Sequence, residues 1–335
     1  MPRLSITLSL GAVVLIALLL LSTAYGTTSI PASDVVQAVL LGIGLVDGEV
    51  APVHRIVFDL RLPRALFAAV IGAGLGVVGV VLQTTTRNDL ADPFLFGLSS
   101  GAAAGAVFVI TVTGDVLGFW TLPLAAFAGG IIASGIVLAL VHSLQTSAPE
   151  KLILAGLAVS FLFSAITNYL IFAGDSRAAH SVIFWMLGGL GLARWESFPL
   201  VCAGLALVLA YTAYRARWLD ALLTGDVTAV TLGVPVRRLR FSMFFIAALA
   251  TAVFVSVAGV IGFVGLMVPH IARGIAGPLH QRLLPTSALV GAALLTGSDI
   301  VSRVILAPQE LPVGVVTTSI GSLFVFLLLY RTARS

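Results

Sequence analysis

Charged side chains are scarce in this sequence: Asp, Glu, Lys and Arg make up 10% of its residues, against roughly 25% in an ordinary soluble domain. That scarcity excludes a surface that lies mostly in water. The sequence is instead 59% hydrophobic with a mean hydropathy of +1.13, so most side chains must face lipid or other helices. The net charge of +4 comes from Lys and Arg scattered in pairs, without the basic face of a nucleic-acid-binding protein. We therefore expect a membrane protein with no nucleic-acid partner.

Residue patterns for catalysis and metal binding are also missing. The single cysteine, Cys202, excludes a disulfide within the chain, and the sequence has no CxxC, no HExxH and no cluster of His with carboxylates. The sequence therefore predicts no metal site and no cofactor. It also lacks the GxxxxGK[ST] loop that binds nucleotide phosphates, so any ATP hydrolysis would have to come from another subunit. We expect a transport subunit and not an enzyme.

One glycine motif needs a separate interpretation. Residues 74–79, GLGVVG, match the GxGxxG pattern of dinucleotide sites, but no strand precedes them and they lie inside an apolar run over 65–82. A run of 18 residues at about 1.5 Å each spans roughly 27 Å, close to the ~30 Å hydrocarbon core of a bilayer. We interpret its small residues as positions where another helix packs closely, namely Ala68, Ala69, Gly72, Gly76 and Gly79.

Apolar runs of similar length recur and predict an all-α integral membrane protein of ten transmembrane helices, forming a single permease domain over 1–335. The first run, within 1–24, is longer than the apolar part of a signal peptide and no clean cleavage site follows, so we expect a retained first helix. The 241–276 run exceeds one span, and we divide it into two helices near Gly262. The other runs cover 65–83, 94–112, 119–144, 152–173, 197–214, 284–306 and 311–330.

Positive charge between the spans predicts their orientation. With the N-terminus inside, twelve of the 18 Lys and Arg residues lie on the cytoplasmic side, as does the C-terminus. Residues 25–60 then form a periplasmic segment and residues 215–240 a cytoplasmic one. The amphipathic 215–240 segment is longer than most connecting loops, which favours a docking platform over a plain loop. The outer side keeps six arginines that call for an acidic partner: Arg55, Arg61, Arg64, Arg177, Arg194 and Arg303.

An ion-coupled secondary carrier is the alternative from a different class. Such a carrier holds its coupling ion with acidic or His side chains inside the membrane. Here the main ionisable residues within the spans are Asp299 and Arg303, four apart on one helix face, where they form either a local ion pair or part of a docking surface. This scarcity argues against the carrier. A membrane scaffold that transports nothing fits ten glycine-rich spans poorly.

Six motifs occur in one order along the chain: RLPR (61–64), NDLADPFLFG (88–97), SSG (99–101), TLGV (231–234), GFVGLMVPHIAR (262–273) and ELPVG (310–314). With them the chain resembles the permease family of ABC importers for iron-siderophores, haem and cobalamin, over nearly its whole length. The resemblance implies the type II importer fold, a homodimer with the pathway at its interface, and one ATPase beneath each subunit.

The resemblance also implies roles for single residues. Arginines that pair with Glu residues of a periplasmic binding protein would be Arg61, Arg64 and Arg303. The 215–240 segment would enter a groove of the ATPase, with coupling residues Asp226, Leu232, Gly233, Val234 and Arg237. The fifth helix, about 152–172, would line the pathway, and two loops near 88–90 and 146–147 would form the inner gate. The implied pathway and gate residues are Asn88, Leu90, Ser147, Asn168, Tyr169 and His180.

His180 departs from the cobalamin-type pattern, which has Arg at this position. An imidazole there is suited to ligating haem iron, or is simply a solvated residue of an outer loop. The expected function is the permease subunit of an inner-membrane ABC importer that moves an iron chelate, siderophore or haem, by alternating access, with cobalamin as the alternative cargo. The expected partners are a second copy, a cytoplasmic ATPase dimer, a periplasmic binding protein, the chelate and membrane lipid.

Overall fold

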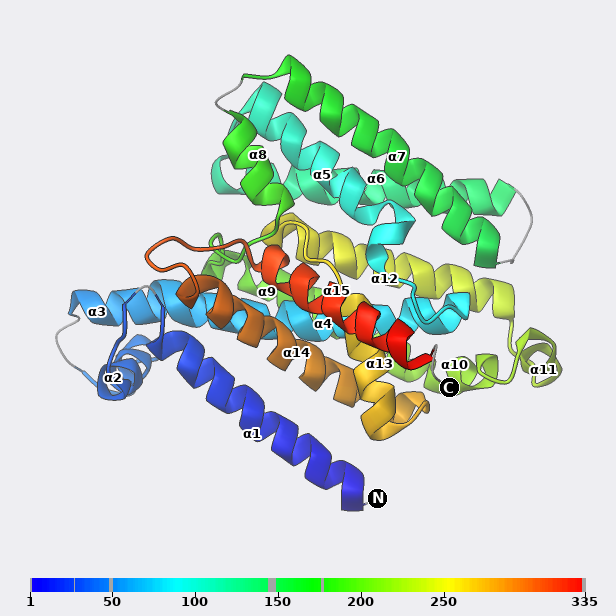
Figure 1. Ribbon diagram of the computed structural model, residues 1–335, viewed down its shortest axis with the longest axis horizontal. Helices are drawn as coiled ribbons and strands as arrows, with labels where there is room; N and C mark the ends of the chain where they lie inside the picture. Colours follow the sequence, from blue (N-terminus) through cyan, green and yellow to red (C-terminus); the bar gives the residue numbers. More distant parts are fainter. Residues whose placement is uncertain (1, 27, 48–50, 144–148, 176–177, 333–335) are drawn as a thin grey trace.

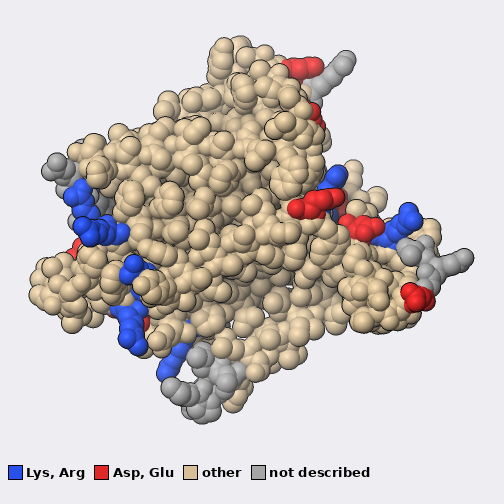
Figure 2. Space-filling model, turned by 180° about the vertical axis from the view of Figure 1, so that it is seen from behind, with Lys and Arg blue, Asp and Glu red and all other residues tan. Residues whose placement is uncertain are grey.

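The computed structural model describes residues 2–26, 28–47, 51–143, 149–175 and 178–332, and within these ranges every regular element is helical. The long helices lie side by side, and α1 begins at the same end of the molecule as α15 finishes (Figure 1). The short helices α10 and α11 lie at that end too, whereas α2 and α3 lie at the opposite one. Viewed from behind, basic side chains gather at the α10–α11 end (Figure 2).

Among the described residues, eight helical segments are long and apolar enough to cross a membrane, and they coincide with eight of the ten predicted spans. They contain α1 (Pro2–Ala24), α4 (Leu62–Thr86), α6 (Thr121–Ser143), α7 (Pro149–Ala173), α9 (Phe198–Tyr214), α12 (Val236–Ala258), α14 (His280–Val304) and α15 (Val313–Thr332). The other two predicted spans correspond to shorter apolar helices, α5 (Leu98–Phe108), which continues as η3 to Thr113, and α13 (Val264–Ala276).

Short helices connect these elements. Towards the α2–α3 end lie α2 (Ala32–Gly42), α3 (Pro52–Arg55) and α8 (Ala178–Met186), and at the other end lie α10 (Ala216–Leu222) and α11 (Asp226–Thr231). The 3₁₀ turns are η2 (Pro93–Phe96), η4 (Gly118–Trp120) and η5 (Trp195–Ser197). Because α3 continues through η1 (Ile56–Arg61) into α4, the last part of the predicted 25–60 segment is the beginning of a continuous 35-residue helix, Pro52–Thr86.

The predicted division of the 241–276 run is confirmed. Helix α12 ends at Ala258 and α13 begins at Val264, so the break surrounds Gly262. Gly259 ends α12 with φ +65°, a left-handed conformation that costs glycine little. A Cβ there would also collide with the backbone carbonyl of Trp185, so α12 ends directly against the end of α8. The break thus places two helix ends and a short loop inside the helical body.

Helix α4 is the buried centre of the fold, and its glycines make the close contacts predicted for them. A Cβ on Gly72 would overlap the carbonyl of Gly291 in α14, and one on Gly79 would overlap the carbonyl of Gly265 in α13. Gly76 also lies close to the backbone of α14, at the carbonyl of Ser287. Since lipid tails are as apolar as leucine, helices in a membrane gain stability from such backbone approach and not from hydrophobic exclusion of water. The dinucleotide interpretation of this motif is excluded.

We predict that Gly79→Ala destabilises the protein. The added methyl group has no space against the Gly265 carbonyl, and overpacking of this kind costs about 1–3 kcal/mol. The matched control is Gly135→Ala in α6, where nothing lies within 4 Å of the new Cβ, and where the change stabilises a helix by roughly 0.5–1 kcal/mol. Thermal unfolding of the purified chain in detergent measures both, and equal melting temperatures for the two variants would contradict the packing model.

Candidate functional site

Two of the three arginines predicted to dock a binding protein are buried and bonded within the chain. Arg61 donates from Nη1 to the Ala24 carbonyl at 2.9 Å and from Nη2 to the Thr28 carbonyl at 2.6 Å. Arg303, only 3% exposed, donates from Nη1 to the carbonyls of Ser22 and Tyr25, both at 3.0 Å. The last carbonyls of a helix have no partner within that helix. The two guanidinium groups therefore cap α1.

Arg64 is different, because it reaches the outside. Its Nε lies 2.9 Å from Oδ1 of the buried Asp299, and its Nη1 lies 2.7 Å from Oε2 of the exposed Glu310. Arg303 pairs with the same Asp299 at 3.0 Å, which confirms a local ion pair four residues apart on α14. Arg64 and Glu310 also line a cavity of about 470 Å³ at this end. The docking role of the three arginines remains a prediction, and Arg64 is the one whose ion pair reaches solvent.

At the opposite end, three consecutive residues of α4 bind three different helices. Gln83 accepts a hydrogen bond from Arg273 of α13 at 2.7 Å through its Oε1. Thr84 Oγ1 lies 3.0 Å from Nε2 of His280, the first residue of α14. The Thr85 carbonyl accepts from Nε of Arg240, near the start of α12, at 2.8 Å. The end of α4 is thus tied to the three helices that follow the 215–240 segment.

The same network continues into the 215–240 segment itself. Asp220 of α10 accepts from the backbone N–H of His280 at 2.9 Å and lies 2.7 Å from its Nδ1. Asp226 of α11 forms two hydrogen bonds to Arg240, at 2.8 and 2.9 Å. This fork geometry is the strong, directional form of an Arg–carboxylate pair. These contacts therefore join α11 to α12 and α10 to α14, and through them both segments to the end of α4. We call these residues the inner polar network: Gln83, Thr84, Thr85, Asp220, Asp226, Arg240, Arg273 and His280.

The predicted coupling residues divide into exposed and inward-facing ones. Leu232 is 65% exposed, and on α11 beside it Val227 and Val230 are 81% and 60% exposed. Gly233 follows with φ +81° and turns the chain, so that Val234 packs inward while Arg237 stays exposed. Asp226 holds Arg240 as described above. Three large apolar side chains thus project from a short, rigidly held segment.

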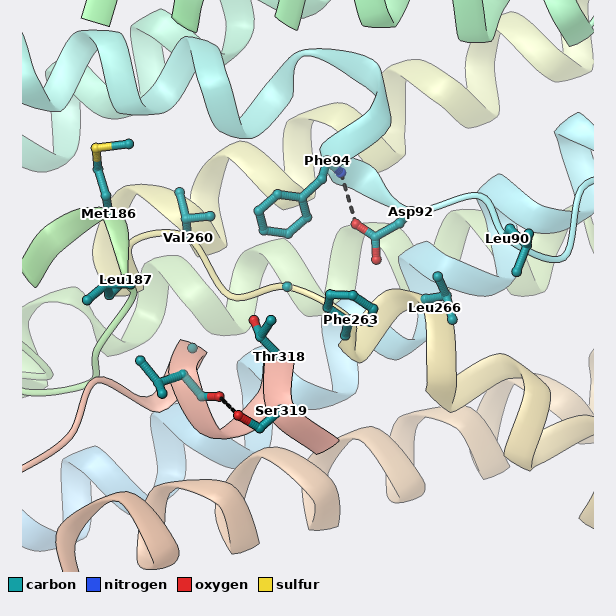
Figure 3. Close-up of a pocket in the computed structure, with 13 residues that line it drawn as sticks. Leu90, Asp92, Phe94, Met186, Leu187, Val260, Phe263, Leu266, Thr318 and Ser319 are labelled. Atoms are coloured by element: carbon teal, nitrogen blue, oxygen red, sulfur yellow. Dashed lines mark hydrogen bonds between the residues drawn. The ribbon is translucent and has the colours of Figure 1, made fainter. Parts of the chain in front are cut away.

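A cavity of about 620 Å³ lies between four segments that are far apart in sequence (Figure 3). Its lining comes from the loop after α4, the end of α8, the break between α12 and α13, and the first turns of α15, and is mainly apolar. The residues are Leu90, Asp92, Phe94, Met186, Leu187, Val260, Gly262, Phe263, Leu266, Gly314, Val315, Thr318 and Ser319. Three of the sequence motifs, 88–97, 262–273 and 310–314, meet here.

Asp92 is the one carboxylate in this lining. Its Oδ1 accepts from the Phe94 N–H at 3.0 Å, while the buried Oδ2 has no hydrogen-bond partner among the described residues. Burial raises the pKa of Asp92 to about 6. The sequence analysis quoted this residue within a motif but assigned it no role. No feature of the sequence singles it out, because only the fold shows that this carboxylate is buried.

The structure brings only some of the predicted pathway and gate residues together. Leu90 lines the cavity, and Asn88 shapes the same loop by accepting from the Leu90 N–H at 2.9 Å. Asn168 and Tyr169 are exposed on α7, and the exposed His180 on α8 lies with its ring 5.5 Å from that of Phe184. None of these three lines the cavity. Their pathway roles stay predictions, and Ser147 lies outside the described residues.

Comparison with known proteins decides the family. The model of the FecCD transport family matches residues 14–331, the span over which the described helices and motifs occur. The chain belongs to the FecCD transport family. It is 41% identical over 310 residues to the "Cobalamin import system permease protein BtuC" of Halobacterium salinarum, covering 91% of this chain and 80% of that one. It is 38% identical to the "Fe(3+) dicitrate transport system permease protein FecD" of Escherichia coli, over 83% of this chain and 86% of that one.

The fold of this FecCD permease also has a solved counterpart. A metal-chelate type ABC transporter in an inward-facing conformation superposes with a TM-score of 0.81 at 30% identity, covering 97% of this chain and 98% of the other. The chain is therefore a permease of an ABC importer, a multi-pass protein of the inner membrane with no catalytic activity of its own. Membership of the family implies an ATPase and a substrate-binding protein as partners, and it sets the ion-coupled carrier aside.

We predict that stability depends on the ionisation of Asp92. Because its pKa is about 6 in the folded chain and about 4 when unfolded, the folded chain binds an extra proton between these values, so stability falls as the pH rises from 4 to 6. The difference corresponds to about 3 kcal/mol in full. Asp92→Asn still accepts from the Phe94 N–H but cannot ionise.

Thermal unfolding in detergent at pH 4.5 and 7.0 measures this effect. The Asp92→Asn variant should be more stable than the wild type at pH 7.0 and lose the part of the pH dependence that lies between 4 and 6. Asp115→Asn, which changes an exposed carboxylate, is the control and should keep the wild-type profile. An unchanged profile in Asp92→Asn would rule out an ionising Asp92.

Proposed function

We propose that two copies of this FecCD permease, each with ten transmembrane helices and cytoplasmic termini, form the pathway of an ATP-driven importer for a bulky metal chelate. The cargo is an iron chelate, either a siderophore complex or haem, with cobalamin as the second candidate. The single observation that carries the proposal is the inner polar network, because it links a docking surface to the helices around the cavity.

The docking surface has the chemistry of a protein interface. Val227, Val230 and Leu232 expose apolar side chains close together at this end of the protein, and an exposed apolar patch of this kind marks an interaction site. A groove of the ATPase covers them in this proposal. Positive charge supports the orientation, since the exposed arginines of the 215–240 segment lie at the end where basic residues gather (Figure 2). This end is then the cytoplasmic one.

The network supplies the route for alternating access. When the ATPases close, α11 moves with them, and its Asp226–Arg240 pair pulls on α12 and the end of α4. Asp220 and His280 pull on α14 in the same way. Gln83 connects this movement to α13 through Arg273, and α13 borders the cavity through Leu266. A bistable set of helix contacts of this kind switches which side is open.

The cavity suits a chelate better than a bare ion. A hydrated metal ion would need several oxygen ligands in place of its water, whereas the lining offers one carboxylate among mainly apolar side chains. A chelate already satisfies its metal and presents a larger, partly apolar surface. Cobalamin fits this description as well, and a relative at 41% identity is named as a cobalamin permease, which is why it remains the second candidate.

Docking of the binding protein is proposed for the outer end. Arg64 and Glu310 form the partly exposed ion pair there, and an acidic residue of the binding protein would compete with Glu310 for the guanidinium. Arg61 and Arg303 contribute positive potential while they cap α1. Charges at the edge of an interface mainly set the association rate and its salt dependence.

Uptake into proteoliposomes tests the proposed function. The chain is reconstituted with its cognate ATPase and binding protein, and a ferric siderophore, haem and cobalamin are offered in parallel. We expect ATP-dependent uptake of one of them, with Arg64→Glu lowering the rate most at low salt. Uptake that persists without the ATPase and follows an ion gradient would overturn the importer model.

We predict that Leu232→Asp abolishes coupling to the ATPase. A carboxylate in place of an interface leucine should weaken ATPase binding at least about tenfold, as measured by co-purification and by stimulated ATP hydrolysis. The matched control is Val36→Asp on α2, which makes the same kind of change at an exposed position on the opposite end. If both variants bind the ATPase as the wild type does, Leu232 is not part of the docking surface.

A further inference from the structure

One arginine at the end of α9 lies among aromatic rings without a counter-ion. The guanidinium carbon of Arg215 is 4.1 Å from the ring centre of Trp218, 4.6 Å from that of Tyr214 and 5.8 Å from that of Tyr211. No side-chain hydrogen bond or ion pair joins it to any described residue, and its Nε is buried without a partner. Cation–π contacts orient a guanidinium, but they leave its N–H donors unused.

The acidic residues nearest in sequence are already occupied. The 215–240 segment contains two carboxylates, Asp220 and Asp226. Asp220 lies 2.7 Å from Nδ1 of His280, and Asp226 is held by both terminal nitrogens of Arg240. Neither is bonded to Arg215. Its neighbour Arg217 also forms no ion pair with a described residue, but that side chain is exposed and makes no cation–π contact there, so water satisfies it.

The position of the cluster is that of a membrane surface. The apolar span that contains α9 ends at Tyr214, directly before Arg215, and Tyr214 itself is 75% exposed. Tyr211 and Trp218 are partly buried against the core, so the aromatic cluster is anchored on one side and open on the other. Tyrosine and tryptophan concentrate where lipid headgroups meet the hydrocarbon, because each combines an apolar ring with a polar group.

We propose that Arg215, held by Tyr211, Tyr214 and Trp218, binds the phosphate of an anionic phospholipid. The planar guanidinium presents paired N–H donors that match phosphate oxygens in a bidentate arrangement. The exposed Tyr214 ring lies beside the glycerol and upper acyl chain, and the two terminal nitrogens of Arg215, which are not buried as Nε is, donate to the phosphate. The site depends only on the membrane location of the chain, so it stands whatever cargo the importer carries.

Two other anions are alternatives for the Arg215 site, namely an acidic residue of the ATPase and free phosphate. The lipid is favoured over both. An acidic residue of the ATPase would have to approach beside the last turn of a membrane span, whereas the exposed docking side chains lie on α11. Free phosphate would gain the same hydrogen bonds but no contact with the open aromatic side. Anionic headgroups are concentrated at the membrane surface, and their negative potential attracts basic residues that lie there.

Native mass spectrometry of the detergent-purified chain tests the proposal with phosphatidylglycerol and phosphatidylcholine as probes. The wild type should retain phosphatidylglycerol in preference, and Arg215→Gln should reduce that retention about tenfold, the loss expected for a charge-assisted hydrogen-bonded pair. Arg215→Lys should fall between them, because it keeps the charge but not the fork. Arg217→Gln is the matched control and should behave as the wild type. Melting temperatures in phosphatidylcholine establish that each variant is folded.

A second measurement needs no variant at Arg215. Phosphatidylglycerol with brominated acyl chains should quench tryptophan fluorescence in the wild type, and this quenching should fall in Trp218→Phe. Equal lipid retention in Arg215→Gln, or an equal loss in Arg217→Gln, would overturn the site. Displacement of the lipid by millimolar inorganic phosphate would identify a free-phosphate site instead, and loss of ATPase binding with unchanged lipid retention would identify an ATPase contact.

Discussion

Close backbone contact along α4 is the constraint on which the rest of the structure depends. In hydrocarbon there is no water to expel from between helices, so stability comes from how near their backbones approach. Gly72 meets Gly291 and Gly79 meets Gly265, so α14 and α13 both pack against α4 without intervening side chains. With α4 at the centre, α1, α9 and α12 also pack directly against it. Its two ends then become the natural places for polar contacts.

The two ends use those polar contacts in different ways. At the α2–α3 end, Arg61 and Arg303 satisfy carbonyls at the end of α1, which holds the first helix against the bundle. At the α10–α11 end, consecutive residues Gln83, Thr84 and Thr85 reach α13, α14 and α12. Since these contacts continue through Asp220 and Asp226, the 215–240 segment is joined to the helix ends and not to the glycine-packed middle. The rigid centre and the linked ends together suit a permease that must move without coming apart.

Several functional residues were beyond the reach of sequence reasoning. In the sequence, Arg61 and Arg303 look like charges of the outer side that need an acidic partner. In the fold, both meet the end of α1, which lies more than 30 residues before Arg61 and about 280 residues before Arg303. Nothing in the sequence shows these contacts. The sequence assigned His280 and Arg240 no role of their own, because their carboxylate partners lie 60 and 14 residues away. The cavity forms from loops and helix ends of four segments, and its one carboxylate, Asp92, is recognisable only when its burial is known.

The sequence by itself determined that the chain is helical, crosses a membrane repeatedly, has no nucleotide-binding loop of its own and resembles ABC importer permeases. Those conclusions follow from apolar run length, from small residues at helical spacing and from motif order, all of which are local in the chain. Tertiary structure alone decided which charges are neutralised, which motifs meet at a cavity, and that Arg215 lies among aromatic rings with no carboxylate partner among the described residues. The reason is that the ion-pair partner of a charged side chain, and the atoms that bury it, come from segments distant in sequence. A charged residue without a partner nearby in the sequence can therefore be paired in the fold.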